Sequence, residues 1–216
     1  MAVHLKRLGI SYFSVPKCAC TSIKTMFFEI ENGFPFKDFM ANETWYHIHK
    51  IYPTRTYDSA AKLTGKNDFK FTVIRSPKAR IMSCYKHWVA PVNSKGMFKE
   101  KEAELLTLSL PVDPNFIEFV EHLEGYRKVL PHIAHHTEPL SYFLGADPDY
   151  FDEIYNLGNL SELPIRLETI TGMKIPIEHE NVSQKVEVPQ SEGHALELKI
   201  NDLFQEDFDI YERFWK

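Results

Sequence analysis

Two stretches decide the fold: residues 8–22, LGISYFSVPKCACTS, and residues 69–83, FKFTVIRSPKARIMS. Each begins with a short apolar run rich in β-forming residues, which is typical of a buried strand, and each run is followed closely by a proline. Beyond each loop, apolar side chains recur at helical spacing, which predicts helices over residues 21–30 and from Pro77 onward. The sequence therefore predicts two strand–loop–helix units.

Two such units joined by a crossover indicate parallel strands in an α/β sheet, whose ligand-binding loops follow the carboxyl ends of the strands. No linker interrupts the 216 residues, so we expect a single domain over residues 1–216, with a parallel central sheet flanked by helices. Further elements are expected from local patterns: a short helix in 57–63, a helix in 115–126, a strand in 150–157, helices over 161–171 and from about 191, and an aromatic tail that packs on the body.

Composition narrows the function classes. A hydrophobic fraction of 44% with 25% charged residues is ordinary for a globular protein, and the net charge of −5 argues against nucleic acid or an anionic membrane as a partner. No apolar run approaches the roughly 18 residues of a membrane span. Cysteines number three, and Cys18 and Cys20 lie too close in sequence for an ordinary bridge. We expect a soluble protein of the reducing cytoplasm.

The loop between the first strand and its helix has the chemistry of a phosphate site. It contains Lys17, Cys18, Ala19, Cys20, Thr21 and Ser22. Small residues let backbone N–H groups turn inward around an anion, while the helix N-terminus, the lysine and the hydroxyls add positive charge and donors. The nucleotide-triphosphatase pattern G-x-x-x-x-G-K-[ST] is absent. A purely structural turn with a solvated lysine is the alternative.

The second loop begins with Arg75, and Ser83 lies two turns into the helix that follows. Arginine suits bidentate recognition of a phosphate, and a nearby serine adds a further donor. An ordinary surface ion pair is the alternative explanation for an arginine at a strand end.

Together, VPKCACTSIK and VIRSPKARIMSCY resemble the nucleotide-binding elements of sulfotransferases that use 3′-phosphoadenosine 5′-phosphosulfate (PAPS), especially the carbohydrate and heparan-type family. The similarity continues more weakly through HHTEPLSYFLG, FDEIYNLGNLSEL and HENVSQK. It implies a P-loop-like α/β fold in which the first loop holds the 5′-phosphosulfate, with Lys17 at the leaving phosphate. It also implies that Arg75 and Ser83 hold the 3′-phosphate, and that Ser183 and Lys185 are further nucleotide contacts.

Transfer of a sulfuryl group to a hydroxyl needs a base, and histidine is suited to that role near neutral pH. The pair His47 and His49, between the two nucleotide motifs, resembles the placement of a catalytic histidine in some heparan-type members. We favour His49 as the base, with His47 second; surface histidines in a variable loop are the alternative. If the segment is extended, both rings point to one side.

A second histidine group, His132, His135 and His136, has spacing that could supply metal ligands, but the remaining ligands are not obvious. Structural or acceptor-pocket roles fit these histidines better. The resemblance requires no metal and no covalent step, so Cys18 and Cys20 are interpreted as small loop residues.

The sequence thus predicts an enzyme that transfers the sulfuryl group of PAPS to a hydroxyl, with a carbohydrate as the preferred acceptor class. Two alternatives remain. One is an ATP-dependent small-molecule kinase, which the missing GK[ST] and the absence of a clear magnesium-binding carboxylate disfavour. The other is a nucleotide-binding interaction module without catalysis.

Overall fold

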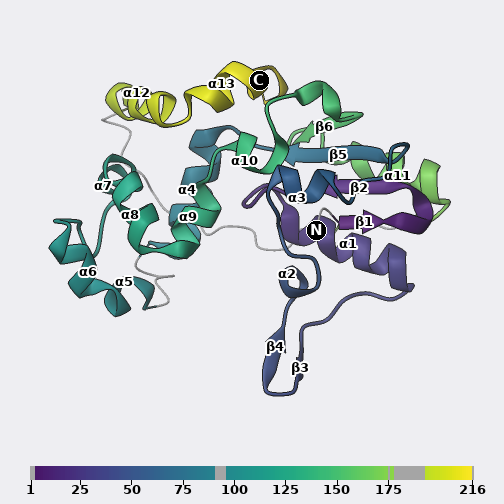
Figure 1. Ribbon diagram of the computed structural model, residues 1–216, viewed down its shortest axis with the longest axis horizontal. Helices are drawn as coiled ribbons and strands as arrows, with labels where there is room; N and C mark the ends of the chain where they lie inside the picture. The colour runs from purple at the N-terminus through teal and green to yellow at the C-terminus, as the bar shows by residue number, and fades with distance from the viewer. Residues whose placement is uncertain (1–2, 91–95, 175, 178–192, 216) are drawn as a thin grey trace. The chain divides into compact units, whose positions relative to one another are not determined.

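The computed structural model describes residues 3–90, 96–174, 176–177 and 193–215 (Figure 1). The chain divides into two compact units, each described below by itself. Unit 1 comprises Met1–Arg75, Leu140–Asn181 and Ile210–Lys216, and unit 2 comprises Ser76–Pro139 and Val182–Asp209. The expectation of one domain over residues 1–216 stays a prediction.

Unit 1 is built on a four-stranded sheet of order β1-β2-β5-β6 (Figure 1). Its strands are β1(Val3–Leu5), β2(Ile10–Phe13), β5(Phe69–Ile74) and β6(Glu153–Asn156). β1 pairs antiparallel with β2, whereas β2 with β5 and β5 with β6 are parallel. The predicted parallel sheet is therefore confirmed, with one antiparallel edge strand. Because β2 and β5 are parallel neighbours, the loops that follow them leave the same edge of the sheet.

Side chains alternate between the two faces of this sheet, as the two-residue period of a strand requires. Tyr12 and Phe71 contribute to a buried cluster with α1(Cys20–Asn32) and α11(Glu162–Thr171). Phe13 and Ile74 contribute to a second cluster with α3(Tyr57–Ala61), α10(Leu140–Leu144) and the aromatic C-terminal residues. The sheet is thus flanked by helices on both faces, as predicted.

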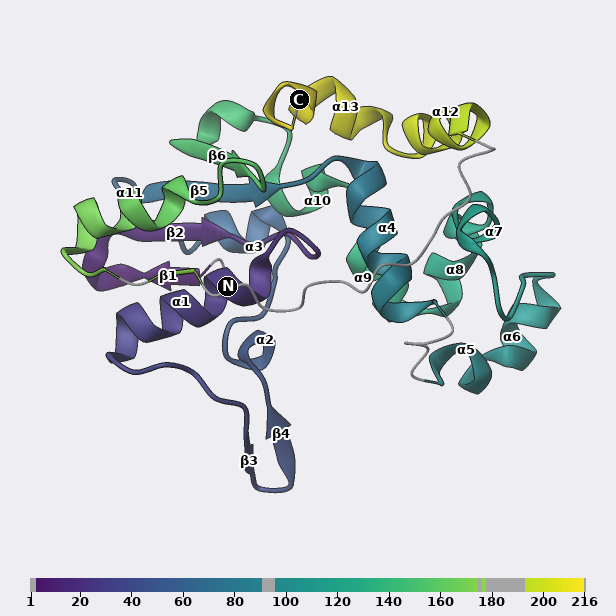
Figure 2. The ribbon, with the colours of Figure 1, turned by 180° about the vertical axis from the view of Figure 1, so that it is seen from behind.

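Between α1 and α3 the chain forms a hairpin, β3(Phe39–Ala41) and β4(Thr44–Tyr46), followed by the short helix α2(Ile48–Ile51). The hairpin extends away from the four-stranded sheet in both views (Figures 1 and 2). Phe39 stacks on Tyr46 with 5.0 Å between ring centroids and nearly parallel planes. Trp45 belongs to the opposite face of the hairpin and is half exposed.

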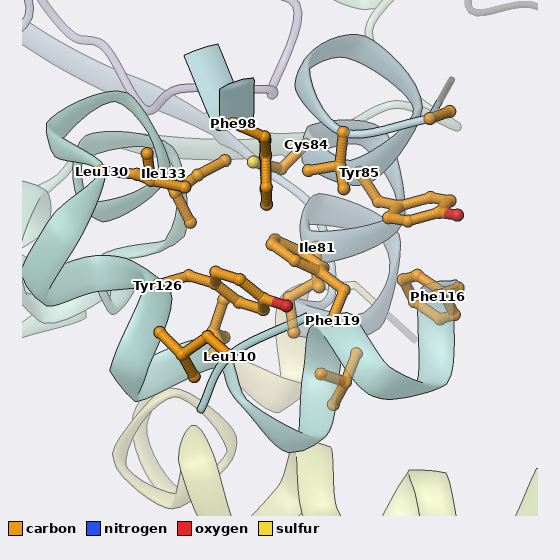
Figure 3. Packing of buried hydrophobic residues seen from close by; sticks show 14 of the residues in the cluster. Ile81, Cys84, Tyr85, Phe98, Leu110, Phe116, Phe119, Tyr126, Leu130 and Ile133 are labelled. Atoms are coloured by element: carbon orange, nitrogen blue, oxygen red, sulfur yellow. The ribbon is translucent and has the colours of Figure 1, made fainter. Parts of the chain in front are cut away.

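Unit 2 is helical. Its helices are α4(Pro77–Trp88), α5(Met97–Glu100), α6(Glu102–Thr107), α7(Phe116–Glu121), α8(Leu123–Val129), α9(Pro131–Thr137) and α12(Gly193–Leu203), and α13(Gln205–Tyr211) contains its boundary with unit 1. Ser76 caps α4, and its hydroxyl accepts a hydrogen bond from the N–H of Ala79. Ile81, Phe119 and Tyr126 lie in one buried cluster that joins α4, α7 and α8 (Figure 3).

Most of the elements expected from local patterns are present at nearly the expected positions. α1, α3, β5, α4, β6, α11 and α12 all overlap the predicted ranges, and Tyr211, Phe214 and Trp215 pack on unit 1 as expected of the aromatic tail. The helix predicted within 115–126 is instead two helices that meet at His122. Within the described residues, no helix combines the length and the apolar character that crossing a membrane requires.

Candidate active site

The loop from Ser14 to the start of α1 has an unusual backbone. Lys17 and Ala19 have φ values of +66° and +56°, in the left-handed region that side chains other than glycine rarely adopt. Alternation of left-handed and ordinary residues is the backbone pattern that turns N–H groups toward an anion, although the N–H of Cys18 donates to the carbonyl of Val15 at 3.3 Å. The N-terminus of α1, with its partial positive charge, begins at Cys20 directly beyond this loop.

The cysteines of the loop are packing residues. Cys18 is fully buried, Cys20 is 7% exposed, and Cys84 in unit 2 is also buried. Cys18, Cys20 and Cys84 form no disulfide bond in the described structure. Burial keeps them away from a substrate, which agrees with their interpretation as small loop residues.

His49 lies directly beside the phosphate-type loop. Its Nε2 is 3.0 Å from Oγ1 of Thr21, the second residue of α1. The segment before it is extended only as far as His47, and then turns into α2, so the two rings are not related by strand alternation. Their centroids nevertheless lie 5.8 Å apart. The structure therefore brings both candidate bases to the same neighbourhood.

His47 and Trp45 are placed along the same extended segment. Trp45 lies in β4, and His47 has extended backbone angles of φ −112° and ψ 166°. Residues two apart in extended chain point to the same side. In the part of the chain that the structure describes, the His47 ring makes no hydrogen bond. This side of the hairpin therefore presents a half-exposed indole and a partly buried imidazole together.

Lys24 is the second polar neighbour of the His49 ring, and the sequence pattern did not identify it as a site residue. Its side chain is fully buried in unit 1. Its Nζ is 3.2 Å from Nδ1 of His49 and donates a hydrogen bond of 2.8 Å to Oγ1 of Thr54. Burial lowers the pKa of Lys24 to about 8. A lysine three residues after Thr21 shares its helix face, which is the signal that could have singled it out.

The contacts of Lys24 extend to the beginning of the loop. Oγ1 of Thr54 lies 3.0 Å from the hydroxyl of Ser14, which is buried just after β2. Ser14, Thr54, Lys24, His49 and Thr21 therefore form one chain of polar contacts. It joins the two ends of the phosphate-type loop through residues that come from outside the loop.

Arg75 follows β5 directly, at the edge of the sheet from which the first loop also leaves. Its Nε is buried and has no hydrogen-bond partner within the described residues. A buried guanidinium N–H without a partner is costly, and an anionic ligand would satisfy it. This observation favours a ligand over the alternative of a surface ion pair.

The remaining predicted site residues are not joined to this group. Ser83 lies on α4 in unit 2 and is 8% exposed, so its pairing with Arg75 stays a prediction. Ser183 and Lys185 lie outside the described residues. His132 and His136 pack their rings against Trp88. No cluster suited to holding a metal ion is formed by the histidine, cysteine, aspartate and glutamate residues that the structure describes.

A serine, a histidine and an aspartate also meet near the start of the chain, but they form a structural network. Ser11 is fully buried and donates to Oδ2 of Asp68 at 2.5 Å, and His4 Nδ1 lies 2.7 Å from the same hydroxyl. The hydroxyl hydrogen of Ser11 is thus donated to the carboxylate of Asp68 and not to His4. A hydrolytic triad would require the hydroxyl to donate to the imidazole.

Comparison with known proteins decides between the chemical classes that this site permits. The model of the sulfotransferase family matches residues 3–212, which is nearly the whole chain. The chain belongs to the sulfotransferase family. No match was found among curated proteins or among solved structures.

Membership in this family makes the protein an enzyme of sulfuryl transfer, as the two motifs predicted. The kinase and the non-catalytic module are therefore both disfavoured. A sulfotransferase requires a hydroxyl-bearing acceptor, a site for an anionic donor and a group that stabilises the leaving anion. The loop with Lys17, the N-terminus of α1 and the two histidines are the described parts that fit these needs.

Proposed function

We propose that this sulfotransferase transfers the sulfuryl group of PAPS to a hydroxyl of a carbohydrate acceptor. The observation that carries the proposal is the anion cradle of residues 16–22 with His49 hydrogen-bonded to its threonine. The cradle would hold the 5′-phosphosulfate with N–H groups of the loop other than that of Cys18, which donates to the Val15 carbonyl, and with the hydroxyls of Thr21 and Ser22.

Arg75 supports the identity of the donor. Its buried Nε has no hydrogen-bond partner among the described residues. Arg75 follows β5, the parallel neighbour of the strand that precedes the cradle. A nucleotide with a second phosphate on the 3′ position would use this guanidinium, together with Ser83 from α4. Ser183 and Lys185 remain proposed contacts of the same nucleotide.

The reaction is a single displacement at sulfur. The acceptor oxygen forms a new O–S bond while the bond from sulfur to the bridging phosphate oxygen breaks, and the departing electron pair leaves with adenosine 3′,5′-bisphosphate. Lys17, which belongs to the cradle loop, would neutralise the charge that develops on that oxygen. The acceptor proton goes to an imidazole.

Between the two histidines, the contacts favour His47 as the base, although the sequence pattern favoured His49. Both ring nitrogens of His49 face hydrogen-bond partners, Thr21 and Lys24. A base needs a lone pair that is open to the substrate, and the ring of His47 makes no hydrogen bond among the described residues. We therefore propose His47 as the proton acceptor. His49 is proposed to orient the Thr21 hydroxyl, with which it makes a hydrogen bond at the cradle.

The acceptor class is supported by Trp45. An exposed indole leaves apolar surface in contact with water. The C–H face of a sugar ring can cover that surface while the sugar hydroxyls stay free. Trp45 is half exposed and shares a side of the extended segment with His47. A sugar packed on this indole would bring a hydroxyl toward the base.

The test is a transfer assay with radiolabelled PAPS across panels of oligosaccharides, simple alcohols and phenols, with adenosine 3′,5′-bisphosphate measured as the second product. Transfer to oligosaccharides that is abolished in Lys17→Ala supports the proposal. Transfer confined to alcohols or phenols would overturn the carbohydrate acceptor. Transfer of phosphate from labelled ATP, with none from PAPS, would overturn the donor.

A further inference from the structure

We propose that Lys24 is a positioning residue that fixes the tautomer of His49 and thereby makes the Thr21 hydroxyl a hydrogen-bond donor to the nucleotide. The inference rests on the proposed function for the identity of the ligand. It does not require that function for the effect of Lys24 on the imidazole, which is a property of the free protein.

The direction of each hydrogen bond follows from the donors available. An ammonium group has three N–H donors and no acceptor, so Nδ1 of His49, 3.2 Å from Lys24 Nζ, must accept. A neutral imidazole that accepts at Nδ1 carries its proton on Nε2. Nε2 lies 3.0 Å from Thr21 Oγ1 and therefore donates to it.

The consequence falls on the Thr21 hydroxyl. Because its oxygen already accepts from His49, its own hydrogen is directed to another acceptor. Thr21 is the second residue of α1, beside the cradle in which the anion would lie. A phosphate oxygen in the cradle is the acceptor that this arrangement prepares. With the opposite tautomer, the threonine would donate to the histidine and would be lost to the ligand.

Burial makes the charge of Lys24 energetically costly unless its contacts compensate for it. Its neighbours on α1, Ile23 and Phe27, are fully buried in the core of unit 1. A methionine at position 24 would fill similar space without the desolvation of a charge. The lysine instead directs its ammonium group to two polar side chains, His49 and Thr54, from the segment that follows the hairpin.

The first test measures the tautomer directly. Two-bond ¹H–¹⁵N correlation spectra of the free protein report which ring nitrogen carries the proton, and His49→Gln assigns the signals. We expect the wild type to show a protonated Nε2 and an Nδ1 with a free-lone-pair shift, and Lys24→Met to show both nitrogens averaged between the two tautomers. A wild-type ring protonated on Nδ1, or a ring unchanged in Lys24→Met, would overturn the proposal.

Lys50→Met is the matched control. Lys50 is exposed on α2, directly after His49, and its Nζ lies over the ring of Tyr46 at 5.7 Å. Its replacement removes an equal positive charge from the residue next to His49, without removing a hydrogen bond to the His49 ring. The His49 tautomer should be unchanged in this variant. An equal change in Lys24→Met and Lys50→Met would mean that loss of a nearby positive charge is enough to shift the tautomer, and would overturn the proposal.

The second test is a double-mutant cycle read by the affinity for adenosine 3′,5′-bisphosphate. Thr21→Val and Lys24→Met should each weaken binding by about 10-fold, the size expected for one hydrogen bond to a charged group. Lys24→Met should add little in the Thr21→Val background, because it acts through Thr21. Additive losses would overturn the proposal. If the wild type fails to bind the nucleotide, the proposed function fails, and the tautomer still decides the role of Lys24.

Discussion

Arg80 on α4 and Asp207 on α13 form an ion pair in the interior of unit 2, with 3.6 Å between Arg80 Nη1 and Asp207 Oδ2. Arg80 is 1% exposed and Asp207 is fully buried. Nη2 of Arg80 also donates to the backbone carbonyl of Glu138 at 2.8 Å. The arginine thus connects three separate segments of the unit, and each charge depends on the other for the stability of its buried state.

Removal of one partner of this pair should be strongly destabilising. We expect Arg80→Met to lower the free energy of unfolding by about 3–5 kcal/mol, because the buried Asp207 would lose the cation of its ion pair and keep only its electrostatic interaction with Arg127 as a known counter-charge. Urea denaturation followed by circular dichroism measures the loss. The double variant Arg80→Met/Asp207→Leu should recover a large part of it, since neither charge of the pair is then buried. A double variant as unstable as the sum of the single variants would contradict this account.

The four-stranded sheet was predictable because its signals are local. A run of β-forming residues ended by Pro16 or Pro77 marks a strand and its loop, and helical spacing after it marks a crossover. The hairpin was not predictable in the same way. Its turn residues Asn42 and Glu43 both have positive φ, which asparagine tolerates but glutamate rarely adopts, so the usual asparagine–glycine signal is missing.

Arg75 provides a test of the nucleotide site. Arg75→Ala should weaken PAPS binding by about 10- to 100-fold, the range for loss of a charge-assisted hydrogen bond. Calorimetry on the folded variant measures the change. Adenosine 5′-phosphosulfate, which lacks the 3′-phosphate, should lose much less affinity. An equal loss for both nucleotides would place Arg75 at a different part of the ligand.

Lys17 should separate binding from chemistry. Its charge matters most when negative charge develops on the departing phosphate oxygen, so Lys17→Ala should reduce kcat by about 100-fold or more. The affinity for adenosine 3′,5′-bisphosphate should fall far less. Steady-state kinetics together with calorimetry distinguish the two effects. A variant with normal kcat and a raised KM for PAPS would show that Lys17 only binds the nucleotide.

The two histidines should respond differently to substitution. If His47 is the base, His47→Ala should reduce kcat by about 100- to 10,000-fold while nucleotide binding is retained. His49→Ala should instead weaken nucleotide binding, because the Thr21 hydroxyl loses its orienting partner. The reverse pattern would return the base role to His49.

Much of the candidate site was readable from the sequence, but its connections were not. The types of residue in the loop and at Arg75 are enough to suggest anion binding. Lys24 escaped notice because it falls between Ile23 and Phe27 in a helix whose apolar spacing dominates the pattern, and spacing does not reveal which polar side chain is turned inward. Its contact with His49 joins residues 25 positions apart, which only the packed structure brings together.

Lys24 should therefore differ from an ordinary structural lysine in its effect on stability. Burial lowers its pKa to about 8 from the value near 10.5 of an exposed lysine. Between these values the unfolded chain binds more protons than the folded chain, so the contribution of Lys24 to stability rises with pH from about 8 to 10.5. A shift of this size corresponds to about 3 kcal/mol.

Comparison of wild type with Lys24→Met isolates this contribution from other groups that titrate in the same range. We expect the variant to gain stability relative to the wild type at neutral pH, because a buried charge has been replaced by an apolar side chain of similar length. That advantage should shrink by about 3 kcal/mol as the pH is raised from 8 to 10.5. Urea denaturation at a series of pH values provides the measurement. A pH-independent difference would show that Lys24 titrates like an exposed lysine. A variant that is less stable at neutral pH would instead make the hydrogen bonds of Lys24 to His49 and Thr54 a net source of stability.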